Sequence, residues 1–185
     1  MVDAQIGQVL KALHKSRKAE NTLVVFTSDH GDMDAAHKLE HKTVFYDEAC
    51  RIPLIFSWPG KIEADQTNRE HLVSNGLDLI PTLCDFAGIA KQKELRGVSI
   101  RPLLQGKKSQ SWRRSLPVEN EIGRMIVSKR YKYIVYDKGE KEEQLLDLQE
   151  SPSEMHNVVH DSAKQNVLSL HRTLFSETFE HGHNN

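Results

Sequence analysis

The sequence predicts an α/β fold followed by a small antiparallel sheet with a C-terminal helix, and three observations carry this prediction. A helical pattern at residues 3–18 precedes a short apolar run at 23–26, which is the order of an α/β unit. A second apolar run follows at residues 52–56. Beyond about residue 110 the pattern changes to short strands in series and one helix. We therefore expect two parts, residues 1–110 and residues 111–185.

The elements of the first part follow from the spacing of their apolar residues. The helix at 3–18 carries Ile6, Val9, Leu10 and Leu13 at helical intervals. The continuous apolar run at 23–26 is typical of a strand buried on both faces of a parallel sheet. A further helix is expected at residues 77–87, with Gly88 as its end; its expected inner face is Leu77, Ile80, Leu83 and Phe86.

The second part shows the period of β-strands. Strands are predicted at residues 115–118, 124–128, 131–136 and 144–148, with a hairpin turn at 137–140. A helix is predicted at about 162–179, where Val167, Leu170, Leu174 and Phe175 are spaced for one face. Strands in series followed by one helix indicate a small sheet covered by that helix.

Composition excludes several classes of function. The chain has 185 residues, with 25 basic and 26 acidic side chains spread along it. A net charge of −1 and a pI near 6.8 argue against a nucleic-acid or anionic-membrane partner. The longest apolar runs are far shorter than a membrane span requires. With two cysteines in 185 residues, we do not expect the fold to depend on a disulfide framework. The compartment stays open, because any signal peptide would precede Met1.

Chemistry is expected where the first predicted strand ends. Ligands of open α/β sheets sit beyond the carboxyl ends of strands, and Asp29, His30 and Gly31 follow the run at 23–26 directly. A carboxylate beside an imidazole can supply two adjacent metal ligands, although the same residues can also form a simple turn. Lys42 could bind an anionic group near the metal. His37 could contact or protonate a substrate oxygen.

These residues stand within a longer series of motifs. In order, the chain reads DAQIGQVLKAL, NTLVVFTSDHG, then His37 and Lys42, then FYDEACRIPLIFSWPG, GLDLIPTLCDFAGI and LRGVSIRPLL. Residues 3–104 resemble the C-terminal part of the catalytic domain of a sulfatase, in the alkaline phosphatase superfamily. The segment YKYIVYDKGEKEEQLLDLQESPSEMHNVV is similar to the small C-terminal subdomain of that family.

The resemblance implies a fold and a set of roles. The fold would be part of the doubly wound sheet of alkaline-phosphatase-like enzymes, with a four-stranded antiparallel sheet and helix attached. Asp29 and His30 would be ligands of the active-site divalent cation, with calcium expected and manganese an alternative because imidazole is softer than oxygen. Lys42 would hold the sulfate of a sulfate ester substrate, and His37 would be a substrate-side histidine.

One departure from the family pattern limits what this chain can do. Sulfatases attack sulfur with a formylglycine made from a Cys/Ser-x-Pro-Ser-Arg motif, and neither Cys50 nor Cys84 begins such a motif. The paired N-terminal metal aspartates of the family are missing as well. The hypothesis is that this chain is the C-terminal part of a longer sulfatase, inactive without the N-terminal half of the catalytic domain. Strand edges left without that half would favour self-association.

Three other interpretations stay open at this point. The segment His37-x-x-Glu40-His41 matches an inverted zinc-peptidase motif, which requires both histidines on one long helix. The chain could also be a degenerate, non-catalytic interaction module. Finally, phosphonate and phosphodiester hydrolases of the same superfamily share similar second halves, so the sequence does not separate sulfate from phospho-substrates.

Overall fold

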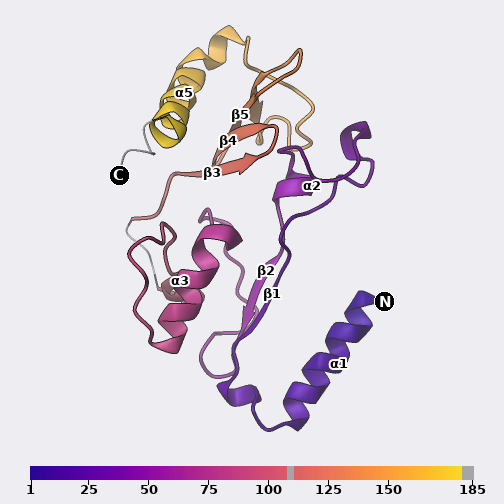
Figure 1. The fold of residues 1–185 in the computed structure, drawn as a ribbon, viewed down its shortest axis with the longest axis vertical. Coiled ribbons are helices and arrows are strands. Elements are labelled where there is room, and N and C mark those ends of the chain that lie inside the picture. The colour runs from indigo at the N-terminus through magenta and orange to yellow at the C-terminus, as the bar shows by residue number, and fades with distance from the viewer. Residues whose placement is uncertain (108–110, 181–185) are drawn as a thin grey trace. The chain divides into compact units, whose positions relative to one another are not determined.

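The computed structural model describes residues 1–107 and 111–180, and they divide into two compact units (Figure 1). The first unit comprises residues 1–29, 53–69 and 74–110, and the second comprises residues 30–52, 70–73 and 111–185. The domain boundary predicted at residue 110 falls on residues 108–110, which lie outside the described residues, so it stays a prediction.

The first unit has the α/β elements that the sequence predicts. Helix α1 (Val2–Lys15) and the short 3₁₀ helix η1 (Ala19–Asn21) lead into strand β1 (Val24–Thr27). Strand β2 (Leu54–Ser57), helix α3 (Asn75–Ala87) and helix α4 (Arg101–Leu104) follow. Gly88 ends α3 in the left-handed conformation (φ 69°), which confirms the predicted stop.

The pairing of β1 corrects one expectation. The apolar run at 23–26 was expected to lie in a parallel sheet with both faces buried, but β1 pairs with β2 in the antiparallel sense. Phe26 and Ile55 are partners in this pairing and stay 41% and 56% exposed. A continuous apolar run does not reveal strand direction, because it records burial potential and not the partner. Within the described residues, these two strands form the whole sheet.

Helix α3 buries a different face from the predicted one. Ile80 and Leu83 are exposed, whereas Asp78, Pro81 and Thr82 are buried. Asp78 accepts hydrogen bonds from the backbone N–H groups of Ser74 and Val98, and Thr82 Oγ1 accepts one from Ile100 N. The returning chain 97–100 therefore satisfies its backbone groups on polar side chains of the helix, and this requirement outweighs apolar spacing.

The second unit contains the predicted antiparallel sheet and its helix. The strands are β3 (Ser115–Asn120), β4 (Gly123–Ser128), β5 (Tyr131–Tyr136) and β6 (Glu143–Asp147), and they pair in the order β3-β4-β5-β6. The 3₁₀ helix η3 (Ser162–Lys164) leads into helix α5 (Gln165–Phe179), which contacts β4 and β5. All four predicted strands and the helix are confirmed. The same unit includes the 3₁₀ helix η2 (Ala36–Lys38) and the short helix α2 (Asp47–Cys50).

The two faces of this sheet bury different partners, as the strand period of two requires. On one face, Tyr133 and Leu145 pack with Val159 and Leu168 beneath α5. On the other face, Met125, Ile134 and Leu146 pack around Phe45, which is fully buried. Phe45 precedes α2, so the segment that carries the predicted site residues is fixed to the sheet by one aromatic anchor.

A buried ion-pair group holds the end of β6. Asp147 is 1% exposed and accepts hydrogen bonds from Arg130 Nε at 2.9 Å and from Lys164 Nζ at 2.9 Å. Hydrogen bonds from Arg130 and Lys164 outweigh the effect of burial and hold the pKa of Asp147 well below its usual range. Asp147 therefore stays ionised and joins the end of β6 to Arg130, which precedes β5, and to Lys164, which ends η3. Within the described residues no helix meets the length and hydropathy of a membrane span.

Candidate functional site

The segment that carries the site lies between two paired strands. β1 ends at Thr27, β2 begins at Leu54, and these two residues are partners in the antiparallel pairing. Residues 30–52 between them belong to the second unit. Several non-glycine residues of this segment have a positive φ, a conformation that L-residues adopt at a cost: Asp34, Ala35, His37, Lys38 and His41. The segment must therefore be held by its contacts.

Gly31 allows this segment to approach α2. Its backbone N–H donates to Ala49 O at 2.8 Å. A Cβ on residue 31 would lie 1.8 Å from the carbonyl oxygen of Glu48, so any other residue would push the two backbones apart. The glycine that follows Asp29 and His30 is thus required by close packing.

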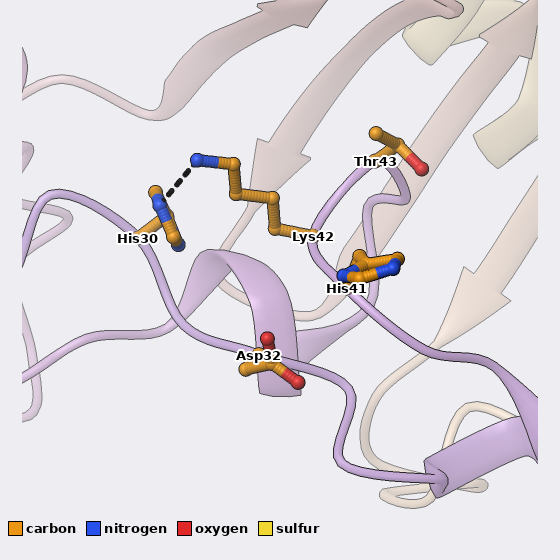
Figure 2. Close-up of a pocket in the computed structure, with 5 residues that line it drawn as sticks. All are labelled: His30, Asp32, His41, Lys42 and Thr43. Carbon is orange, nitrogen blue, oxygen red and sulfur yellow. Dashed lines mark hydrogen bonds between the residues drawn. The ribbon is translucent and has the colours of Figure 1, made fainter.

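His30 and Lys42 meet in an open pocket of about 410 Å³ (Figure 2). Lys42 Nζ lies 2.6 Å from His30 Nε2, and His30 Nδ1 lies 2.7 Å from Gly31 O. Because a carbonyl can only accept and an ammonium can only donate, Nδ1 carries the proton and Nε2 presents its lone pair. The pocket is lined by His30, Asp32, His41, Lys42 and Thr43.

Three lining residues were missed by the sequence interpretation. Asp32, His41 and Thr43 do not belong to the motifs that suggested the site, although His41 and Thr43 flank Lys42. Asp32 Oδ1 accepts a hydrogen bond from the backbone of Asp34 at 3.0 Å, which forms a local turn. Adjacency to Lys42 was the signal available for His41 and Thr43.

Asp29 ends the first unit, and a peptide bond joins it to His30, the first residue of the second. Ser28 Oγ donates to Asp29 Oδ1 at 3.3 Å. Among the described residues, no group of three or more His, Cys, Asp and Glu side chains gathers as a complete metal site. The predicted ligands Asp29 and His30 are thus adjacent in sequence, and His30 Nε2 accepts from Lys42 at 2.6 Å in this structure. The Nδ1-protonated tautomer of His30 is one that a metal-binding histidine can have.

His37 lies apart from the residues that line the pocket. It belongs to η2, its ring stacks on Tyr46 with centroids 3.9 Å apart, and its Nε2 lies 3.8 Å from Glu48 Oε2. The structure therefore brings Lys42 to His30 and brings His37 to α2.

The zinc-peptidase interpretation fails on backbone geometry. It requires His37 and His41 on one long helix, but η2 ends at Lys38 and both histidines have a positive φ. His41 lines the pocket of Lys42 and His37 stacks on Tyr46. The left-handed residues interrupt the helical repeat that would align the two rings.

Cys50 is not placed to react. Burial raises the pKa of its thiol to about 11, and its sulfur points to the carbonyl of Val44 at 3.7 Å. At neutral pH the thiol stays protonated, and a protonated thiol is a poor nucleophile.

A family described as N-sulphoglucosamine sulphohydrolase, C-terminal, matches residues 35–179 of this chain. This chain belongs to the sulfatase family. The match includes Lys42, α2 and the whole four-stranded sheet with its helix. The predicted fold class and family membership are thereby confirmed.

Relatives and solved structures agree with the family. A Delta 4,5-hexuronate-2-O-sulfatase of Bacteroides thetaiotaomicron is 38% identical over 96% of the sulfatase chain, which spans 38% of that relative. A structure described as a 2-O GAG sulfatase matches 99% of this chain and 41% of its own, with a TM-score of 0.89 and 35% identity. A phosphonate monoester hydrolase of Agrobacterium radiobacter matches 97% of this chain and 39% of its own, at a TM-score of 0.81 and 27% identity. The chain thus spans about two fifths of these proteins.

Proposed function

We propose that this chain is the C-terminal part of a sulfatase that hydrolyses sulfate esters, with Lys42 as the residue that holds the sulfate group. The observation that carries the proposal is the contact of Lys42 with His30 in the open pocket. In this contact the Lys42 ammonium donates to His30 Nε2, so a compact positive charge lies beside the histidine that follows Asp29 in sequence. Family membership and the sulfatase relatives support the reaction class.

Lys42 would act on the sulfate by charge. An ammonium donates up to three hydrogen bonds and can neutralise sulfuryl oxygens as negative charge grows on them. The Thr43 hydroxyl can also donate to such an oxygen, and His41 adds a ring that can carry a proton. Asp32 also lines the pocket, and its Oδ1 accepts a hydrogen bond from Asp34 N within the loop.

Asp29 and His30 are proposed as the chain's share of a divalent-cation site, calcium or manganese. When bound, such a cation polarises the sulfuryl oxygens as a Lewis acid. His30 would offer Nε2 to the cation in place of its contact with Lys42, while Gly31 O keeps the proton on Nδ1. Calorimetric titration with calcium and with manganese, on the chain and on Asp29→Ala, tests this share of the site. If Asp29→Ala binds the cation as well as the unmodified chain does, Asp29 is not a ligand of the site.

The nucleophile is proposed to reside elsewhere, as a formylglycine in the N-terminal half of the catalytic domain. The chain lacks the motif for it, and Cys50 is half-buried with its thiol pKa raised to about 11. His37, which stacks on Tyr46 and lies apart from the residues that line the Lys42 pocket, remains proposed as a substrate-side histidine. We expect the pure 185-residue chain to hydrolyse no aryl sulfate. Metal-dependent turnover by this chain would contradict the assignment of the nucleophile.

Sulfate binding gives the direct test of Lys42. Titration of the chain with inorganic sulfate, followed by NMR of the His30 and His41 rings, should show saturable shifts. Lys42→Gln should abolish these shifts, whereas Lys38→Gln, at an exposed lysine of the same segment, should leave them unchanged. Equal sulfate shifts in the chain and in Lys42→Gln would refute the proposed role.

A phospho-substrate is the second candidate, because a phosphonate monoester hydrolase shares the fold at a TM-score of 0.81 and 27% identity. The same titration with phenylphosphonate separates the two. Tighter binding of sulfate than of phenylphosphonate favours the sulfatase assignment, and the reverse order favours the phosphonate hydrolase. A chain that binds no metal, sulfate or phosphonate would mean that the N-terminal half of the catalytic domain is needed to build the site. The non-catalytic module is ruled out by an upstream in-frame segment of the gene with the Cys/Ser-x-Pro-Ser-Arg motif.

A further inference from the structure

The helix α2 is held by a buried charged group that lies outside the candidate site. Lys132 is 2% exposed, and Glu154 is 3% exposed. Lys132 Nζ lies 2.6 Å from Asp47 Oδ1 and 2.7 Å from Glu154 Oε1, and it donates to Phe45 O at 3.1 Å. We call Lys132, Glu154 and Asp47 the α2 clamp.

Strand alternation determines on which face of the sheet the Lys132 side chain lies. In β5, residues 131, 133 and 135 face α5, so Lys132 shares the opposite face with Ile134 and Tyr136. That face packs on Phe45. A lysine in this position is buried beneath the segment that carries the site. Three oxygen partners from two segments satisfy the ammonium.

Glu154 supplies the cap that α2 lacks. Tyr46 is the N-cap residue and, among the described residues, its side chain makes no capping hydrogen bond. Glu154 Oε2 instead accepts a hydrogen bond of 2.6 Å from Asp47 N, the first N–H of the helix. Such N–H groups require an acceptor from outside the helix. Glu154 itself has a φ of 56°, which a non-glycine residue adopts when its surroundings hold it there.

The charges of the clamp fit one another. Burial opposes the ionisation of Asp47, but Lys132 and Arg51 together outweigh it, and the pKa of this carboxyl lies below its usual value. Asp47 and Glu154 thus face one buried lysine, while Arg51 binds the second oxygen of Asp47 at 3.3 Å. Removal of Lys132 would leave two carboxylates against each other without their shared cation.

The clamped helix contacts the site segment on two sides. Tyr46 stacks on the His37 ring, with an angle of 7° between the planes. Ala49 O accepts the N–H of Gly31, the residue after His30. Both contacts are made by α2 or by its N-cap residue, and the site segment has several left-handed residues that need such support.

We infer that Lys132 and Glu154 are positioning residues for the site, acting through α2 on the ring of His37. The inference rests on the proposed function for the role of His37, but the contacts that it uses do not depend on the reaction. Neither residue lines the pocket of Lys42. Their contacts with the site segment are made through Phe45, which accepts from Lys132, and through α2 with its N-cap residue Tyr46.

The test reads the stack of Tyr46 on His37 by NMR. In the unmodified chain, the ring protons of His37 should be shifted upfield by the face of Tyr46, and Tyr46→Leu identifies this shift by removing it. Lys132→Met keeps the length of the side chain without its charge, and we expect the upfield shift to be lost in the folded protein. Glu154→Gln should reduce it.

A matched control separates positioning from general destabilisation. Lys164→Met removes another largely buried lysine, paired with Asp147 and Glu150. By strand alternation, Asp147 lies on the α5 face of the sheet, opposite to the face that carries Lys132. Lys164→Met should lower the free energy of unfolding while the His37 shift stays unchanged. An unchanged His37 shift in folded Lys132→Met would overturn the inference. If Lys132→Met does not fold, an unchanged shift in Glu154→Gln overturns it.

The outcome is independent of the sulfatase proposal. The NMR measurement needs neither metal nor sulfate. A His37 shift that is lost in Lys132→Met therefore supports the clamp even where the sulfate titration fails.

Discussion

Lys42 Nζ and His30 Nε2 lie 2.6 Å apart, and His30 Nδ1 lies 2.7 Å from Gly31 O. The two contacts assign one tautomer to His30, with the proton on Nδ1. We predict that nitrogen NMR of the chain shows this tautomer for neutral His30 and that Lys42→Gln leaves it in place, because Gly31 O still accepts. A neutral His30 with its proton on Nε2 would contradict the geometry.

Substitution of Gly31 should destabilise the site segment. Gly31→Ala would place a Cβ 1.8 Å from Glu48 O, and overpacking of this kind costs about 1–3 kcal/mol. We expect a loss of that size in the free energy of unfolding from urea denaturation. Gly7→Ala is the matched control, because a Cβ at residue 7 of α1 has no neighbour within 4 Å. It should leave the protein unchanged or stabilise it by up to about 1 kcal/mol. Equal effects of the two changes would contradict the close approach.

The ion pairs of Asp147 should show in the pH dependence of stability. Its pKa is lowered in the folded protein, so its stabilising effect is complete above the unfolded pKa, near 4, and declines as the pH falls below that value. Asp147→Asn should lower the free energy of unfolding at pH 7 by about 3 kcal/mol, since it leaves Arg130 and Lys164 without their buried partner.

The difference in the free energy of unfolding between Asp147→Asn and the unmodified protein should become smaller as the pH falls from 4 to 2. Urea denaturation at several pH values measures it. Glu150→Gln is the control, because Glu150 binds the same two cations at a 56% exposed position. Its effect should be below about 1 kcal/mol. A constant difference at all pH values would show that Asp147 acts by packing alone.

The exposed pair Phe26 and Ile55 should promote self-association. They are partners in the pairing of β1 with β2. Within the described residues, neither strand pairs with a third strand. Unpaired strand edges with apolar side chains are templates for another chain. We expect sedimentation velocity to show oligomers that Ile55→Thr reduces while keeping a residue suited to strands. Val9→Thr, at a 68% exposed position of α1, should leave the oligomers unchanged; a strictly monomeric chain at high concentration would contradict the expectation.

The sequence predicted the second unit better than the first, for a physical reason. In strands 131–136 and 143–147, alternate side chains pack on two different partners, α5 on one face and Phe45 on the other. The sequence of these strands therefore shows the alternation that is typical of β-structure. In β1 the apolar run is continuous and shows no alternation between two faces. The antiparallel pairing with β2 could therefore not be predicted from it. The inner face of α3 was wrong because Asp78 and Thr82 are buried to serve backbone N–H groups, a demand that apolar spacing does not record.

Part of the site was also accessible from the sequence. Lys42 and His30 do meet, although they are 12 residues apart in the chain. His37 lies beside Tyr46 and Glu48 instead. Residues with a positive φ between His30 and Lys42 change the direction of the chain there. The contribution of Lys132 and Glu154 could not be predicted, since it joins residues up to 107 positions apart through a buried group.

The pairing of Thr27 with Leu54 has a consequence for how such a chain can diversify. Antiparallel partners lie about 5 Å apart, so the 26 residues between them form an insertion whose two ends nearly touch. A change in the length of such an insertion alters closure entropy only slowly, so the two strands can receive insertions of different length, provided that Phe45 and Asp47 keep their contacts with the four-stranded sheet. The residues proposed to meet the substrate thus belong to an insertion, and the residues that pair the strands lie outside it.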